Sequence, residues 1–206
     1  FDIKNLSEYF TYPKIVSISS VKEGAFENEY WPGGGMKYCV PEGASGYNGN
    51  HVPPGCASYF LESQNEGRLL YGEDEEGRYL LAATDNITGE VLLLPDTLEI
   101  DDEAMSGCGE SFTLDSAGMA RLRYIGDYAF MDSGVTGDII LPDTLRYLGG
   151  YTFYGCTGIS SIHIDGPLDW YKNEFHGPEL RSSVFSGCTN LETVTFGSEC
   201  GVKTIG

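Results

Sequence analysis

Short blocks of sequence recur along this 206-residue chain, and the repetition constrains its fold more than any other feature. Leu94–Leu98 (Leu-Pro-Asp-Thr-Leu) returns as Leu141–Leu145, and Ile125–Phe130 returns in related form as Leu148–Phe153. Several features recur in the same order, which predicts stacked units of about 23 residues, a period typical of solenoids. A single unit cannot bury its apolar face alone, whereas a stack of units buries that face continuously.

Each unit contains one segment with the pattern of a strand. Ile162 and Ile164 alternate around His163, as a half-buried strand requires. A turn and a second short apolar pair follow, and a Gly, an Ala or Thr, and a Phe close the unit. We therefore expect a mainly β or α/β-type solenoid over residues from about 87 to 206, with its parallel strands in one sheet.

The residues that close the units are expected to stack in the core. They are Phe130, Phe153 and Phe185, together with Cys108, Cys156 and Cys188 at a common phase. Free Cys behaves as a small hydrophobe, so the cysteines should form an inward ladder on adjacent coils. A disulfide or a metal within the ladder is the alternative, but zinc favours close Cys pairs and the sequence has none. Cys200 has no obvious partner.

These motifs resemble the BspA-like, or treponemal-type, leucine-rich repeat family of bacterial surface proteins. The resemblance covers residues 119–164 and 183–206, and in shortened form 92–108. It implies a curved right-handed solenoid, an extracellular setting, and a role in attachment or protein recognition. It implies no catalytic site.

The repeat does not extend over the whole chain. Residues 1–68 match the repeat poorly, apart from a degenerate unit near 15–26. We predict that they form an irregular N-terminal cap or small module. Residues 69–206 are predicted to form the solenoid, which opens with a β-hairpin at 69–81. The last unit stops within its motif, so we expect an array truncated at its C-terminal end.

Charge narrows the range of partners. Acids outnumber bases 31 to 12, which gives a net charge of −19 and excludes nucleic-acid readers and polybasic membrane binders. No apolar run approaches the ~18 residues of a membrane span.

We expect a secreted or cell-surface protein whose signal peptide has been removed. In that oxidising setting, Cys39 and Cys56 are expected to form a disulfide.

Motifs for catalysis are absent. The sequence contains no nucleophile elbow, no His-Glu-x-x-His and no phosphate-binding loop. Cys156 is predicted to face inward and His163 outward, so contact within a Cys–His pair such as this one is not expected. We therefore predict no catalytic residue, no metal and no cofactor.

A display surface is the remaining candidate for function. The outward strand positions are predicted to be Leu93, Thr113, Ile140, His163 and Thr195. After the strand that bears His163, an insertion of nine residues carries aromatic side chains, and aromatics dominate interface energetics. The predicted ligand-binding residues are Ser161, His163, Asp165, Trp170, Tyr171, Phe175 and Thr195. Two alternatives remain open: the face is only solvated, or the insertion packs back onto the core.

These observations favour a non-enzymatic recognition or adhesion protein. Its partner is expected to be a protein, basic or on a host surface, because a strongly acidic surface attracts cations. One alternative is a carbohydrate-binding accessory module that uses Trp170 and Tyr171 as sugar platforms. Another is a structural spacer that carries a further domain.

Overall fold

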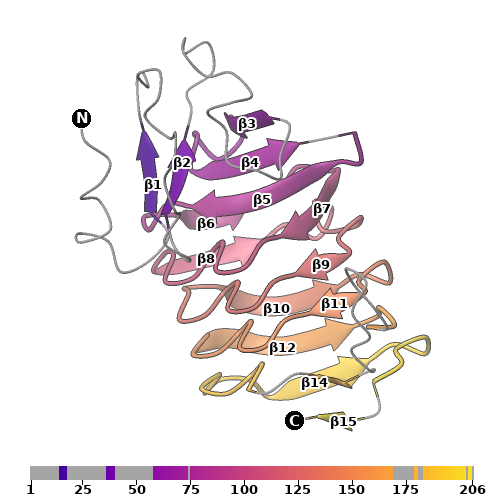
Figure 1. Ribbon diagram of the computed structural model, residues 1–206. Helices are drawn as coiled ribbons and strands as arrows, with labels where there is room; N and C mark the ends of the chain where they lie inside the picture. The colour runs from indigo at the N-terminus through magenta and orange to yellow at the C-terminus, as the bar shows by residue number, and fades with distance from the viewer. Residues whose placement is uncertain are drawn as a thin grey trace.

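The computed structural model describes residues 14–17, 36–39, 58–73, 75–168, 179–180, 183–202 and 204–205. These residues contain strands and turns and no helix, so the mainly β form of the expected solenoid is the correct one. Figure 1 shows the strands stacked along one axis from β3 to β15. No helix long and apolar enough to cross a membrane occurs in this described part of the chain.

The strands follow one another at short intervals. In chain order they are β1 (Lys14–Ser17), β2 (Met36–Cys39), β3 (Ser58–Leu61), β4 (Leu69–Glu73), β5 (Arg78–Ala83), β6 (Thr88–Val91), β7 (Thr97–Ile100), β8 (Ser111–Leu114), β9 (Tyr124–Ile125), β10 (Thr136–Leu141), β11 (Tyr147–Leu148), β12 (Gly158–Ile164), β13 (Glu179–Leu180), β14 (Thr193–Phe196) and β15 (Thr204–Ile205).

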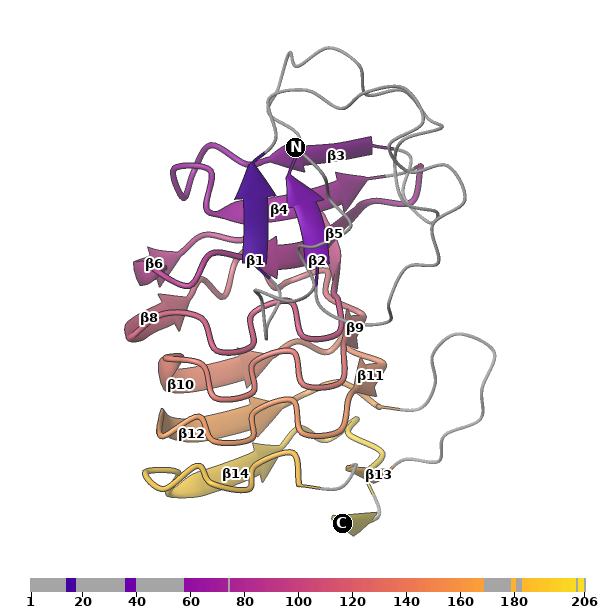
Figure 2. The same cartoon turned by 60° about the vertical axis from the view of Figure 1, so that its left-hand side comes forward.

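Successive strands of the repeat region alternate between two stacks. One stack contains β6 and β8 followed by β10, β12 and β14, joined by an isolated bridge between Phe112 and Val135. The other runs in the order β3, β4, β5, β7, β9 and β11, and it is parallel from β5 onward. Figure 2 shows the two stacks on different sides of the solenoid.

The expectation of one parallel sheet is therefore wrong. The second short apolar pair of each unit, such as Tyr124 and Ile125 in β9, also pairs with its counterpart one coil away. In the unit, this segment is too short to show the alternation by which a strand is recognised. The coils from β8 to β11 thus contribute one longer strand to the first stack and one two-residue strand to the second.

The predicted hairpin is present at the N-terminal end of the repeats. Strands β4 and β5 pair antiparallel, with Glu73 opposite Arg78. Strand β3 adds to this hairpin in antiparallel register, and β1 and β2 form a separate parallel pair. The boundary at residue 68 stays a prediction. The expected Cys39–Cys56 disulfide lies outside the residues whose side chains are described.

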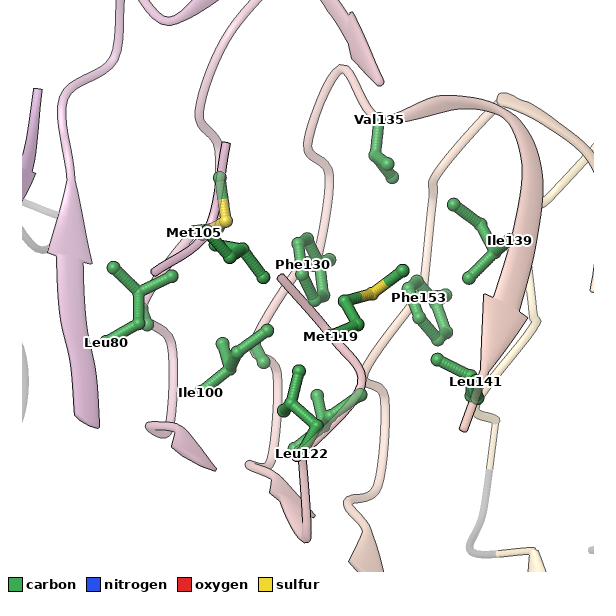
Figure 3. Close-up of a cluster of buried hydrophobic side chains, with 14 of the residues drawn as sticks. Leu80, Ile100, Met105, Met119, Leu122, Phe130, Val135, Ile139, Leu141 and Phe153 are labelled. Atoms are coloured by element: carbon green, nitrogen blue, oxygen red, sulfur yellow. The ribbon is translucent and has the colours of Figure 1, made fainter. Parts of the chain in front are cut away.

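The core is a column of side chains between the two stacks, and Figure 3 shows part of it. The rings of Phe130 and Phe153 stack with centroids 5.3 Å apart, and Phe153 stacks on Phe185 at 6.3 Å. Phe130 and Phe153 are fully buried, whereas Phe185 is only half-buried. Met105 occupies the same position in an earlier coil and is fully buried as well. The predicted register of the Phe column is confirmed.

The cysteine ladder differs from its prediction in one rung. Ser133 occupies the position between Cys108 and Cys156, so these two cysteines do not lie on adjacent coils. The Ser133 Oγ lies 3.6 Å from the Cys156 Sγ. The Cys156 thiol donates to the Phe130 carbonyl at 2.9 Å, and the Cys188 thiol donates to the Phe153 carbonyl at 3.0 Å. A buried serine hydroxyl can replace the thiol in this ladder because hydrogen-bonding groups surround it.

Close approach of neighbouring coils explains one repeated glycine. A Cβ atom placed on Gly149 would collide with the backbone of Gly126 and Asp127 in the previous coil. Gly149 instead donates its N–H to the Ile125 carbonyl at 2.9 Å, and Gly126 makes the equivalent bond to Ile100 at 2.8 Å. The Leu-Gly and Ile-Gly pairs of the repeat therefore mark where one coil's backbone rests on the next.

The cysteines among the described side chains are free: Cys108, Cys156, Cys188 and Cys200. Desolvation by burial raises the pKa of Cys108 and of Cys156 to about 12 each, and it also raises the pKa of Cys188. The described residues contain no group of three or more His, Cys, Asp or Glu side chains able to hold a metal ion. Cys108 and Cys156 lie within the hydrophobic core, and Cys188 and Cys200 pack against it.

Candidate functional site

The outer side of strands β10, β12 and β14 carries two in-register rows of side chains. Cα pairing aligns Asp138 with Ser161 and Ser161 with Thr193. The same pairing aligns Ile140 with His163 and His163 with Thr195. We call these two rows, together with Asp165, the polar face. Its residues are Asp138, Ile140, Ser161, His163, Asp165, Thr193 and Thr195.

The alternation of strand residues produces this face. Ile139 and Ile162 lie between its rows and are buried at 1% exposure each, and Leu141 and Ile164 beyond them are fully buried. Because successive side chains of a strand point to opposite sides of the sheet, the intervening residues point to solvent. Burial of these apolar residues therefore determines which side chains of the strands point to solvent.

His163 is the centre of a hydrogen-bonded group on this face. Its Nε2 lies 2.9 Å from the Asp165 Oδ1, and its Nδ1 lies 2.7 Å from the Thr195 Oγ1. A carboxylate can only accept, so Nε2–H donates to Asp165. In the neutral ring Nδ1 is then an acceptor, and the Thr195 hydroxyl donates a hydrogen bond to it. The group spans β12, the residue after it, and β14.

Backbone contacts hold Asp165 beside the imidazole. The Asp165 N–H donates to the Leu141 carbonyl at 3.1 Å, and the Gly197 N–H donates to the Ile164 carbonyl at 2.9 Å. A Cβ atom on Gly197 would collide with the Asp165 carboxylate. The glycine after β14 therefore leaves the space that this carboxylate occupies.

A second carboxylate organises the neighbouring row. The Asp138 Oδ1 accepts the Ser161 hydroxyl at 2.7 Å and the Ser160 hydroxyl at 3.2 Å. Ile140, two residues further along β10, is an exposed apolar side chain at 52%. The face thus presents an apolar side chain between two hydrogen-bonded carboxylates, a mixture suited to contact with another macromolecule.

The hydroxyl, imidazole and carboxylate of this group follow one another in the order used for nucleophile activation. The His163 and Asp165 side chains are 37% and 40% exposed, so water screens their interaction. The arrangement offers fixed donors and acceptors on an open surface.

The structure brings together part of the predicted site. Ser161, His163, Asp165 and Thr195 lie on neighbouring strands of one face. The other predicted residues, Trp170, Tyr171 and Phe175, lie outside the described residues. The Cys156 thiol bonds within the core while His163 lies on the outer face.

One of the predicted outward positions is wrong, and another lies outside the expected row. Leu93 is only 2% exposed, so the prediction that it faces outward is wrong. Strand β6 ends at Val91, before Leu93, whereas the equivalent strand β10 continues to Leu141. Val91 is itself fully buried, so Leu93, two residues further along, lies on the same side of the chain and enters the core. Thr113 is exposed but pairs with Glu90, and it does not continue the row of Ile140.

Sequence reasoning missed Asp138. It lies two residues before Ile140 on the same strand, so the alternation that selected Ile140 also points to Asp138. The Ser160–Ser161 pair one coil later supplies the donors for its carboxylate. A carboxylate opposite two serines on the next repeat was the available signal.

Comparisons with known proteins agree with the repeat architecture. The family model described as the BspA type leucine rich repeat region matches residues 82–206 in six copies. No curated protein matches the chain.

Two solved structures are similar. One is a leucine rich cell surface protein from Faecalibacterium prausnitzii, with 16% identity and a TM-score of 0.43, covering 89% of this chain and 59% of that protein. The chain therefore spans less than two thirds of that relative. The other is a leucine rich repeat protein of T. pallidum, with 17% identity and a TM-score of 0.32, covering 66% of this chain and 86% of that one. With the family model matched over more than half of its length, the chain belongs to the BspA-type leucine-rich repeat family.

Proposed function

We propose that this chain is a non-enzymatic recognition module of a secreted or cell-surface protein, and that it binds a protein partner through the polar face. The observation that carries the proposal is the exposed Ile140 beside the hydrogen-bonded group of His163, Asp165 and Thr195. An apolar contact surrounded by oriented polar groups is the composition of a protein interface. The family match supports a role in interaction at a surface.

The partner is expected to present basic side chains to this face. Asp138 and Asp165 place two carboxylates on it, and the whole chain carries a net charge of −19. Such a field steers cationic surfaces toward the module and repels acidic ones. The insertion with Trp170, Tyr171 and Phe175 follows the same strand and is proposed to extend the contact area.

Quantitative capture from a cell-surface protein extract tests the proposal. Wild-type protein and the variants Ile140→Asp and Thr195→Lys would be immobilised at equal density, and the retained proteins would be quantified by mass spectrometry. We expect a defined protein to be retained by the wild type and lost from both variants. Thr113→Lys, a matched change at an exposed position outside the rows of the polar face, should leave retention unchanged.

The opposite outcomes are equally specific. Proteins retained equally by wild type and by both face variants would contradict the use of this face. Binding to a glycan array that is lost on Trp170→Ala, with no protein retained, would favour the carbohydrate-binding alternative. Retention that occurs only at low salt, for the wild type and for Thr113→Lys alike, would indicate nonspecific attraction to the net charge of the chain.

A further inference from the structure

We propose that a second surface of this protein, formed by Tyr128, Tyr151 and Tyr154, binds arginine side chains of a basic protein segment. We call these three residues the tyrosine cluster. They lie on the turns that connect β9 to β10 and β11 to β12, not on the strands of the polar face. This inference concerns a different surface and does not depend on the proposed function.

The three rings form one continuous group across two coils. Tyr128 and Tyr151 stack with centroids 5.1 Å apart and planes at 12°. Tyr151 and Tyr154 make a tilted contact at 5.8 Å and 54°. Tyr128 and Tyr154 are each 37% exposed, which places them among the few exposed large hydrophobic side chains of the described residues. The contacts hold the exposed rings in fixed orientations.

The backbone beneath the cluster is unusual for such large residues. Tyr128 and Tyr151 have φ values of 58° and 55°, in the left-handed region that bulky residues rarely adopt. Equivalent positions in neighbouring coils are occupied by Glu103 at 56° and Ser183 at 60°. The turn therefore accepts a small polar residue, and tyrosine is not needed to form it. Strained residues whose side chains are exposed point to a role outside folding.

Two acidic residues lie on coils beside the cluster. Asp132 donates its N–H to the Tyr154 carbonyl at 2.7 Å, and its carboxylate occupies the space where a Cβ atom of Gly155, the residue after Tyr154, would lie. Glu103 occupies the left-handed position one coil before Tyr128, and its N–H donates to the Asp127 carbonyl at 3.0 Å. An aromatic face attracts a cation through its quadrupole, and a nearby carboxylate adds to that attraction.

This combination favours a guanidinium over a sugar. Arg stacks on aromatic rings and can also pair with a carboxylate, so a single side chain can satisfy both features. A basic segment would also be drawn to the net charge of −19.

The test measures binding of an arginine peptide, (Gly-Arg)4, by fluorescence anisotropy in about 150 mM salt, where surface attraction is largely screened. The double variant Tyr128→Leu/Tyr154→Leu is expected to weaken binding about tenfold, because it removes two cation–π contacts without changing the charge. Tyr128→Phe/Tyr154→Phe keeps the rings and should bind within about twofold of wild type. Thermal denaturation of each variant confirms folding.

Two matched controls separate a specific site from the general charge. Phe196→Leu removes an aromatic ring that is 38% exposed on β14 and should leave the affinity unchanged. Asp132→Asn should weaken binding severalfold, whereas Asp143→Asn, which removes the same charge from an exposed residue in the turn between β10 and β11, should not.

The proposal is overturned by either of two results. Equal losses for Asp132→Asn and Asp143→Asn, with no effect of the tyrosine variants, would mean that the peptide responds only to the overall charge. Binding of neutral oligosaccharides that is lost in Tyr128→Leu/Tyr154→Leu, with unchanged peptide binding, would assign the cluster to sugars.

Discussion

The rings of Phe130 and Phe153, one coil apart in the repeat, lie nearly parallel at 13° with their centroids 5.3 Å apart. Both rings are fully buried, and Phe130 donates its backbone N–H to the Thr152 carbonyl at 2.8 Å. The stack and the hydrogen bond together fix the register of the two coils. In this column of Phe130, Phe153 and Phe185, side-chain packing and backbone hydrogen bonding therefore align the same coils.

Replacing Phe153 tests the importance of this column. Phe153→Ala removes a ring that contacts Phe130 on one side and Phe185 on the other. We expect the free energy of unfolding to fall by ~3–5 kcal/mol, the range for an emptied aromatic site in a core. Urea denaturation measures the change. Ile140→Ala, at an exposed position, should cost less than about 0.5 kcal/mol. A loss below ~1 kcal/mol for Phe153→Ala would contradict the packing described above.

Two glycine substitutions separate steric collision from backbone strain. Gly107 has a φ of 65° and open space around an added Cβ, so Gly107→Ala should cost about 1–2 kcal/mol from the left-handed conformation alone. Gly149→Ala forces a Cβ into the backbone of the previous coil and should cost more, about 3 kcal/mol. Chemical denaturation compares the two. The close contact between coils would be disproved if Gly107→Ala were the more damaging change.

The periodic part of the fold could be predicted because it depends on residues that recur. Phe130, Phe153 and Phe185 share one phase, and stacking equal units places equal positions above one another. The second strand stack was missed because its strands β9 and β11 contain only two residues each. Their pairing depends on the backbone of neighbouring coils, which a single unit does not reveal.

Prediction of the polar face succeeded where a strand reaches the predicted outward residue and failed where the strand ends before it. His163 and Thr195 lie on strands whose inward residues alternate regularly, so their outward orientation follows from the pattern. Leu93 matches Ile140 in the sequence repeat, but β6 ends two residues before it. Where a strand ends is decided by tertiary contacts, and a repeat alignment does not contain that information.

Buried ionisable groups predict that the protein loses stability in alkaline solution. Burial raises the pKa of Cys108, Cys156 and Tyr71 to about 12 each. In an unfolded chain the thiols ionise near pH ~8.5 and the phenol near ~10. Above these values the unfolded state has released protons that the folded state keeps, so stability falls as pH rises and is complete only below pH ~8.5. Each thiol contributes a slope of about 1.4 kcal/mol per pH unit in that window.

Urea midpoints measured between pH ~7.5 and ~10.5 would show this decline. The variant Cys108→Ala/Cys156→Ala removes both thiols, so its stability should depend less steeply on pH above ~8.5, even if it is lower at neutral pH. Identical slopes for this variant and the wild type would show that the two thiols do not cause the effect.

The last prediction concerns the separation of stability from binding on the polar face. The His163–Asp165 pair is more than one-third exposed, and exposed pairs contribute little to folding. We expect His163→Ala and Thr195→Val to change the free energy of unfolding by less than about 1 kcal/mol each, as measured by urea denaturation. The same variants should lose retention of the protein partner in the capture experiment, because they remove the imidazole or the hydroxyl that orients it. If either variant instead unfolded the protein, the hydrogen-bonded group would be part of the scaffold. If both folded and bound normally, recognition would not use His163.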